Sequence, residues 1–222
     1  MESAVPAVMT ALIMPKDSCS VAELQLTDER AVPRFGTDSA APAGLNAVLC
    51  KVLWAALQPV DGMIMQAAHP PQVFQKQLPH VLGIDFAGTV AETPPGTDTG
   101  FSVGDRVCGF TGACKPGGGT LAQYCSVPAD CIAKVPDSMP LADAATVPCC
   151  ALTAAAGLWR HLKLDREHAD RNAGTTMLIY GASTCVGQYA AQLAKLAGVS
   201  AFLHGYAHAH VHWCAPVPPH RL

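Results

Sequence analysis

The sequence predicts a mixed α/β fold, with a small β-barrel domain first and an incomplete α/β domain after it. Short apolar segments follow one another closely up to about residue 140 with no helical pattern between them, which is typical of a small β-barrel. The pattern then changes to an alanine-rich stretch, Leu141–Leu162, and to a strand–turn–helix sequence from Met177 onward. We therefore expect a β domain at residues 1–140, linking helices with a first βα unit at 141–198, and an atypical tail at 199–222.

The β domain is expected to contain strands with turns between them. The predicted strands are Met9–Met14, Val21–Leu26, Ala47–Ala56, Pro79–Val90, Phe101–Phe110, Thr120–Val127 and Ile132–Val135. The first two are expected to form a hairpin, and Leu57–Gly62 is expected to be a turn. Gly83, Ala87 and Gly88 lie inside an apolar run, which indicates bulges or close backbone approach.

The second half begins with helices. Leu141–Leu162 is apolar around most of its circumference and predicts one or two buried helices, bent at Pro148. Lys163–Ala173 is charged and is expected to be a surface loop. The domain boundary is expected near residues 140–160.

A βα unit follows this loop. Met177–Tyr180 predicts a buried strand, Gly181–Gly187 a tight turn, and Gln188–Ala197 a helix with Gly198 as its C-cap. Such a unit binds a pyrophosphate at the first helical amides, so it is typical of a dinucleotide-binding, Rossmann-type domain. Only Gly181 and Gly187 remain of the usual glycine pattern, so an ordinary βα turn that binds nothing is the alternative.

Composition narrows the function classes. The net charge is −3 and charged residues make up 14% of the chain with no basic face, which argues against nucleic acid as a partner. The longest apolar stretch, Ala144–Trp159, is interrupted by Pro148 and is short for a membrane span. The ten cysteines include no C-x-x-C pair, and we find no secretory signal. We expect reduced thiols and a cytoplasmic protein.

Five segments in order resemble the medium-chain dehydrogenase/reductase superfamily. They are GIDFAGTV at Gly83–Val90, FSVGDRVCGF at Phe101–Phe110, GGTLAQYCSVPAD at Gly118–Asp130, KVPDSMPLADAATVP at Lys134–Pro148, and LIYGASTCVGQYAAQLAKLAG at Leu178–Gly198. The chain has no four-cysteine zinc lobe, so it resembles the zinc-free reductases. QPVDGMIM at Gln58–Met65, the helix with Thr153, the polar insert at 163–173 and the Ser-Thr of the turn make it most similar to fungal trans-acting enoyl reductases of highly reducing polyketide synthases.

The resemblance implies a GroES-like β-barrel, an incomplete Rossmann-type domain and a reaction. NADPH is the implied cofactor, and the implied substrate is an α,β-unsaturated thioester on the acyl carrier protein of a polyketide synthase. The reaction needs contact between the nicotinamide and the β-carbon, and donors for the developing oxyanion. It needs no covalent nucleophile. We expect no metal and no membrane partner.

The resemblance also implies site residues. The cofactor-contact residues are Val60, Asp61, Gly62 and Met63, together with Ser183, Thr184, Cys185 and Val186 of the phosphate turn. Many family members have a lysine in place of Met63, so a cationic contact is missing here. Thr153 is the implied catalytic residue, and the implied substrate pocket is bordered by Ala154, Ala155, Ala156, Gly157, Leu158, Trp159, Arg160 and His161. From the residues alone, Thr153 is better explained as a helix residue bonded to a backbone carbonyl, and Asp61 as a turn former.

The family pattern ends near Gly198, apart from a possible second strand at Val199–Leu203. We expect Gly205–Leu222 to be a non-native end caused by a shifted frame or a retained intron, with weak NADPH binding and poor solubility as consequences. His204, His208, His210, His212 and Cys214 suggest a zinc site, but no carboxylate lies near them in the sequence and we predict no metal. A non-catalytic fragment and a general zinc-free quinone or alkene reductase are the alternative functions.

Overall fold

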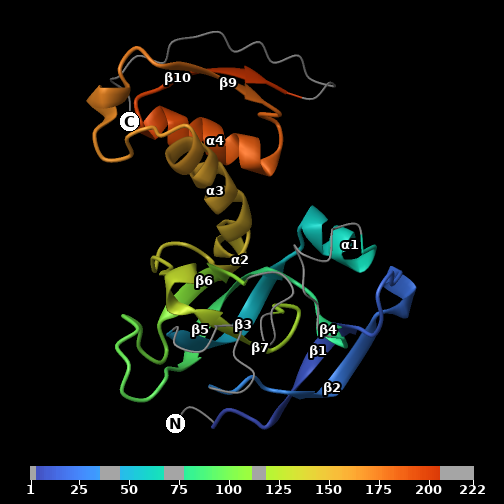
Figure 1. The fold of residues 1–222 in the computed structure, drawn as a ribbon. Helices are drawn as coiled ribbons and strands as arrows, with labels where there is room; N and C mark the ends of the chain where they lie inside the picture. Colours follow the sequence, from blue (N-terminus) through green and yellow to red (C-terminus); the bar gives the residue numbers. More distant parts are fainter. Residues whose placement is uncertain (1–3, 36–45, 68–77, 112–118, 206–222) are drawn as a thin grey trace. The chain divides into compact units, whose positions relative to one another are not determined.

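The computed structural model describes residues 4–35, 46–67, 78–111 and 119–205. The chain divides into two compact units, Met1–Pro148 and Cys149–Leu222, and each is described by itself (Figure 1). The three predicted domain ranges, 1–140, 141–198 and 199–222, stay a prediction.

The first unit is built from two antiparallel sheets (Figure 1). The three-stranded sheet has the order β2-β1-β4, with β1 at Val8–Met14, β2 at Gln25–Ala31 and β4 at His80–Val81. The five-stranded sheet has the order β7-β3-β5-β6-β8, and its strands are β3 (Ala47–Ala56), β5 (Asp85–Glu92), β6 (Arg106–Phe110), β7 (Tyr124–Pro128) and β8 (Ile132–Lys134). The predicted β domain is confirmed.

Alternating apolar residues of the five-stranded sheet form the main core of this unit. The core residues include Val48, Cys50, Phe86, Val90, Val107 and Val127, all with no exposed surface. Gly88 lies where β5 approaches β3 most closely, because a Cβ there would meet the Lys51 carbonyl oxygen at 1.9 Å. The close approach lies beside a bulge between Val52 and Trp54, as the small residues of this run predicted.

Two predicted elements of the first unit are wrong in type. Val21–Glu23 is a 3-10 helix (η1) and not the start of a strand, since the Glu23 carboxylate accepts hydrogen bonds from the Ser20 amide (3.0 Å) and hydroxyl (2.9 Å). The strand of the hairpin begins only at Gln25. The predicted turn at Leu57–Gly62 runs instead into helix α1, Pro59–Met65, because proline at the first helical position and Asp61 at the third favour a helix start.

Short helices follow the sheets. The 3-10 helix η2 (Ala129–Cys131) lies between β7 and β8, and α2 (Leu141–Ala144) contacts β3, β5 and β6. Helix α3 (Pro148–Ala155) then continues as a π-helix, η3 (Ala156–His161). The alanine-rich stretch is thus helical as predicted, but Pro148 starts a helix and does not bend one.

The second unit contains the predicted strand, turn and helix. Strand β9 (Thr176–Tyr180) leads into helix α4 (Cys185–Leu196), and β10 (Ser200–His204) returns parallel to β9, with Thr176 opposite Ser200 and Tyr180 opposite His204. Gly198 follows the helix with a φ of +74°, the conformation expected at a helix C-terminus. The first residues of the predicted atypical tail therefore form a regular parallel strand.

Helix α4 covers one face of this two-stranded sheet. Leu158 of η3 packs with Ile179, Ala194, Ala197 and Val199 in the core of the unit. On the strands the alternate side chains Leu178 and Tyr180 are each 66% exposed. The prediction of a buried strand is therefore wrong for Leu178 and Tyr180: only Ile179 of the strand is buried, because α4 covers one face of the sheet among the described residues.

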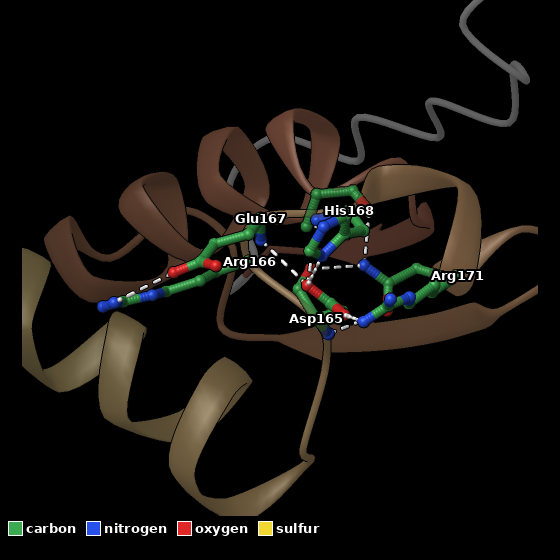
Figure 2. A network of polar contacts seen from close by, with 7 residues as sticks. Asp165, Arg166, Glu167, His168 and Arg171 are labelled. Carbon is green, nitrogen blue, oxygen red and sulfur yellow. Dashed lines mark hydrogen bonds and ion pairs between the residues drawn. The ribbon is translucent and has the colours of Figure 1, made fainter.

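The polar insert at residues 163–173 is an ordered surface segment that ends in the 3-10 helix η4 (Ala169–Asn172). Asp165 is its centre: the carboxylate accepts hydrogen bonds from the amides of Glu167 and His168, both at 2.9 Å, and from Arg171 Nη1 at 2.9 Å (Figure 2). These donors, the His168 amide first, hold the pKa of the Asp165 carboxyl well below its usual range.

Asn172 fixes this insert to the end of α4. The side chain is only 4% exposed, accepts a hydrogen bond from the Asp165 amide (2.9 Å), and donates to the carbonyl oxygens of Asp165 (2.6 Å) and Ala197 (2.7 Å). The insert predicted as a charged loop is thus part of the structure that supports β9 and α4.

Among the described residues, all eight cysteines are thiols. The same part of the chain contains no group of three metal-ligating side chains. None of its helices combines the length and the apolar character that crossing a membrane requires.

Candidate cofactor and active site

The turn between β9 and α4 is hydrogen-bonded to the end of strand β10. The amides of Gly181 and Ala182 both donate to the His204 carbonyl oxygen, at 2.8 and 2.9 Å. Gly181 has a φ of +84°, which a residue with a side chain adopts only with strain. The Thr184 amide donates to the Gly181 carbonyl oxygen at 3.0 Å, so the backbone donors considered for a phosphate are the amides of Cys185 and Val186.

Thr184 caps the helix that follows. The Thr184 hydroxyl donates to the Gly181 carbonyl oxygen (2.8 Å) and accepts from the Gly187 amide (3.1 Å). A Cβ on Gly187 would meet the Gly181 carbonyl oxygen at 2.2 Å, so only glycine lets the helix start this close to the turn. The amides of Cys185 and Val186, at the first two helical positions, have no acceptor within the helix.

This helix start has the chemistry of an anion site. Two amides without intrahelical acceptors point along the helix axis, and the helix dipole adds a partial positive charge at this end. Ser183, Thr184 and Cys185 are exposed and Val186 is half-buried, so a ligand has access to the turn. The four predicted phosphate-turn residues are therefore brought together at one helix N-terminus.

Thr153 lies in α3, and its hydroxyl donates to the Cys149 carbonyl oxygen at 2.7 Å. This bond, four residues back in the helix, is the alternative that the sequence left open for Thr153. The hydroxyl proton is used, but the oxygen keeps lone pairs that can accept a hydrogen bond. The catalytic role of Thr153 stays a prediction.

The predicted substrate-pocket segment runs along one helix. Ala154 and Ala155 end α3, and the remaining six residues, Ala156–His161, form the π-helix. Ala154 and Leu158 are buried, whereas Arg160 and His161 are exposed. A π-helix is rare and is often found at functional sites. The Trp159 Nε1 donor is buried without a hydrogen-bond partner among the described residues.

The other predicted cofactor contacts lie in the first unit. Val60, Asp61, Gly62 and Met63 follow Pro59, the first residue of α1, in the helix. Asp61 is 5% exposed. Its burial raises the pKa of the carboxyl, and this is the largest effect on it. Hydrogen bonds from the amides of Gln58 and Gly83 act in the opposite direction and lower the pKa. The side chain is thus an internal group of the unit and not a solvated turn former.

Sequence reasoning missed two side chains beside α1. Gln58 Nε2 donates to Asp85 Oδ2 at 2.8 Å, and Asp85 is fully buried at the start of β5. A charged residue inside the apolar run Gly83–Val90 was a signal for such a bond, because buried carboxylates need partners. The partner itself follows only from the fold.

His204 is one of the histidines considered for a zinc site. Its ring packs edge-on against the Tyr180 ring, with the two ring centroids 4.9 Å apart. His208, His210, His212 and Cys214 lie outside the described residues.

Comparisons with known proteins agree with this fold. Residues 44–137 match the alcohol dehydrogenase GroES-like domain. The curated relatives include the trans-enoyl reductase traG of Penicillium crustosum, which is 33% identical over 165 residues, 70% of this chain and 43% of traG. The chain spans about half the length of the curated relatives it matches.

Solved structures of similar fold include oxidoreductases of the same class. An alcohol dehydrogenase superfamily protein from Novosphingobium aromaticivorans is 30% identical with a TM-score of 0.68, over 90% of this chain and 54% of that one. The mycobacterial protein Rv1454c, solved in complex with NADPH, is 26% identical with a TM-score of 0.64, over 88% of this chain and 52% of that one.

The antiparallel sheets of the first unit are a GroES-like domain, and the parallel strands with α4 match part of a Rossmann-type domain. Together they define the medium-chain dehydrogenase/reductase fold. Within that superfamily, the sequence is similar to the trans-enoyl reductases of fungi.

Proposed function

We propose that this chain takes part in an NADPH-dependent enoyl reduction in fungal polyketide biosynthesis. The observation that carries the proposal is the β9–α4 turn, where the Cys185 and Val186 amides lack intrahelical acceptors beside exposed Ser183 and Thr184. Similarity to proteins named trans-enoyl reductases and to a structure with bound NADPH supports it.

The residues fit the cofactor. Ser183–Val186 would hold the pyrophosphate, since their helix start offers N–H donors, and Val60–Met63 would contact the cofactor from α1. When bound, NADPH would supply a hydride for the β-carbon of an α,β-unsaturated thioester and leave as NADP⁺, and the α-carbon would take a proton from water. Thr153 accepts a hydrogen bond at the reacting centre, and Ala154–His161 border the substrate.

The proposed substrate is an enoyl thioester on the acyl carrier protein of a polyketide synthase, so that synthase is the proposed partner. The thioester carbonyl gains negative charge as the hydride arrives, and donors placed at this oxygen lower the barrier. The eight described cysteines are thiols, which supports a reducing, cytoplasmic setting.

A charge substitution at Cys185 tests the cofactor site. Cys185→Glu puts a carboxylate at the first position of α4, where it favours the helix dipole but repels a phosphate. Cys185→Gln is the matched control, since it has the same shape without the charge. In titrations followed by NADPH fluorescence, we expect saturable binding for the wild type and for Cys185→Gln, and a loss of about tenfold or more in affinity for Cys185→Glu at an unchanged or higher Tm.

Equal affinity in Cys185→Glu and Cys185→Gln would refute the assignment of the turn. The catalytic assignment has a separate test: Thr153→Val keeps the shape of the side chain and removes the hydroxyl. We expect slower reduction of a carrier-bound enoyl thioester at unchanged NADPH affinity. Unchanged turnover would leave Thr153 as a packing residue only, and faster turnover with a free quinone than with the thioester would favour a general quinone reductase.

A further inference from the structure

The junction between β3 and α1 is short and tightly bonded. Strand β3 ends at Ala56 and α1 begins at Pro59, so only Leu57 and Gln58 connect them. The position of α1 is set by these two residues together with Val60 and Ile64, which pack in an apolar cluster of the same unit.

The main chain of Gln58 is bonded to Asp61. The Gln58 amide donates to Asp61 Oδ2 at 2.8 Å, and the Asp61 amide donates to the Gln58 carbonyl oxygen at 2.9 Å. Asp61 is buried and its Oδ1 atom has no hydrogen-bond partner among the described residues. Burial of an incompletely bonded carboxyl is unfavourable, and the capping contact with the Gln58 amide offsets part of this cost.

The side chain of Gln58 reaches in the other direction, to the sheet. Its Nε2 donates to Asp85 Oδ2 at 2.8 Å. Asp85 is fully buried and lies opposite Ala56 in the β3–β5 register. Gln58 thus links the start of α1, through its main chain, to a fixed point of the five-stranded sheet, through its side chain.

Gly62 follows directly in the helix thus held. A Cβ on Gly62 would meet no atom within 4 Å in the described part of the chain, so packing there does not require glycine. Its φ does not lie in the positive range either. Glycine within a helix is unfavourable by about 0.5–1 kcal/mol relative to alanine, and one of its uses is close backbone approach to a ligand.

We propose that Gln58 is a positioning residue, whose hydrogen bond to Asp85 holds the first turn of α1 so that the main chain at Gly62 is presented to the cofactor. The link from α1 to the cofactor rests on the proposed function. The placement of α1 by the Gln58–Asp85 hydrogen bond does not, and it is measured separately.

A charge swap tests the hydrogen bond. Gln58→Glu places a carboxylate against the Asp85 carboxylate, whereas Asp85→Asn keeps an oxygen acceptor for Gln58. The double variant Gln58→Glu/Asp85→Asn restores one hydrogen bond with donor and acceptor exchanged. Gln66→Glu is the matched control, because Gln66 is exposed at the other end of α1. The readouts are hydrogen–deuterium exchange of the α1 amides, NADPH affinity and Tm.

We expect Gln58→Glu to raise amide exchange in α1 and to weaken NADPH binding, each about tenfold, as is typical for coupled contact pairs. The double variant should return to within about threefold of the wild type, and Gln66→Glu should change neither quantity. A role in stability alone would lower Tm without this reciprocal rescue of binding and exchange.

Failure of the double variant to rescue exchange would overturn the proposal, and so would unchanged exchange in Gln58→Glu. If Gln58→Glu does not fold, Gln58→Met removes the same bond without adding charge, and α1 exchange in that variant decides. Absence of NADPH binding by the wild type would refute the proposed function, while the exchange data would still support or overturn the positioning of α1.

Discussion

Replacing Asn172 with alanine should destabilise the second unit strongly. The substitution removes one acceptor and two donors from a side chain that is 4% exposed, and it leaves the Asp165 amide and the carbonyl oxygens of Asp165 and Ala197 unpaired. Each net hydrogen bond contributes about 1 kcal/mol, and a buried group left unpaired adds to the loss. The expected loss in the free energy of unfolding is about 2–4 kcal/mol.

The assay is thermal unfolding by scanning calorimetry. For a unit of the size of Cys149–Leu222, about 1 kcal/mol corresponds to roughly 4–8 °C, so Asn172→Ala should lower its Tm by roughly 10–25 °C. Asp170→Ala changes an exposed side chain of the same 3-10 helix and should leave Tm within about 2 °C. A Tm for Asn172→Ala equal to that of this control would refute the reasoning that Asn172 anchors the insert.

Three further outcomes are expected. Thr184→Ala should lower the stability of the second unit by about 1 kcal/mol in urea denaturation, because it removes the cap on the Gly187 amide; no change would show that the cap is not needed. Asp165→Asn should be less stable than the wild type at pH 7. Because the folded state lowers the pKa of Asp165, this difference should be present above the ordinary carboxyl pKa and disappear as the pH falls through the lowered one, so parallel stability curves would contradict the assignment. Gly62→Ala should raise Tm and weaken NADPH binding, since the added methyl favours the helix but occupies the proposed contact; unchanged affinity in a titration would remove Gly62 from the cofactor site.

Regular elements with long apolar patterns could be predicted from the sequence. Strand β3 has the predicted bounds, Ala47–Ala56, and β9 with α4 is the predicted strand–turn–helix. These segments are predictable because their apolar residues repeat at the period of the element that they form.

Short elements set by a few polar atoms were harder to predict. Val21–Glu23 alternates like a strand, but one carboxylate on the Ser20 amide and hydroxyl favours a helical turn. Pro59 likewise starts a helix where a turn was expected. In both cases local hydrogen bonding or capping determines whether the segment is a helix, a strand or a turn. The periodicity of the apolar residues does not indicate these local contacts.

The candidate site was predictable only in part. The turn at Ser183–Val186 follows from local sequence, since the Thr184 hydroxyl bonds within the same βα unit and the turn is bonded to the next strand. The Gln58–Asp85 hydrogen bond joins residues 27 positions apart, and the Asn172–Ala197 bond joins residues 25 positions apart. Both depend on strand register and helix packing, which the fold determines.

Hydride transfer tests the central claim most directly. The chain is mixed with NADPH that carries deuterium at the transferred position and with an enoyl thioester on an acyl carrier protein, and the product is analysed by mass spectrometry. We expect a saturated product with one deuterium at the β-carbon, formed more slowly by Cys185→Glu than by Cys185→Gln at an NADPH concentration near the wild-type Kd. An unlabelled or unreduced thioester, under conditions where the labelled cofactor is bound, would contradict this claim.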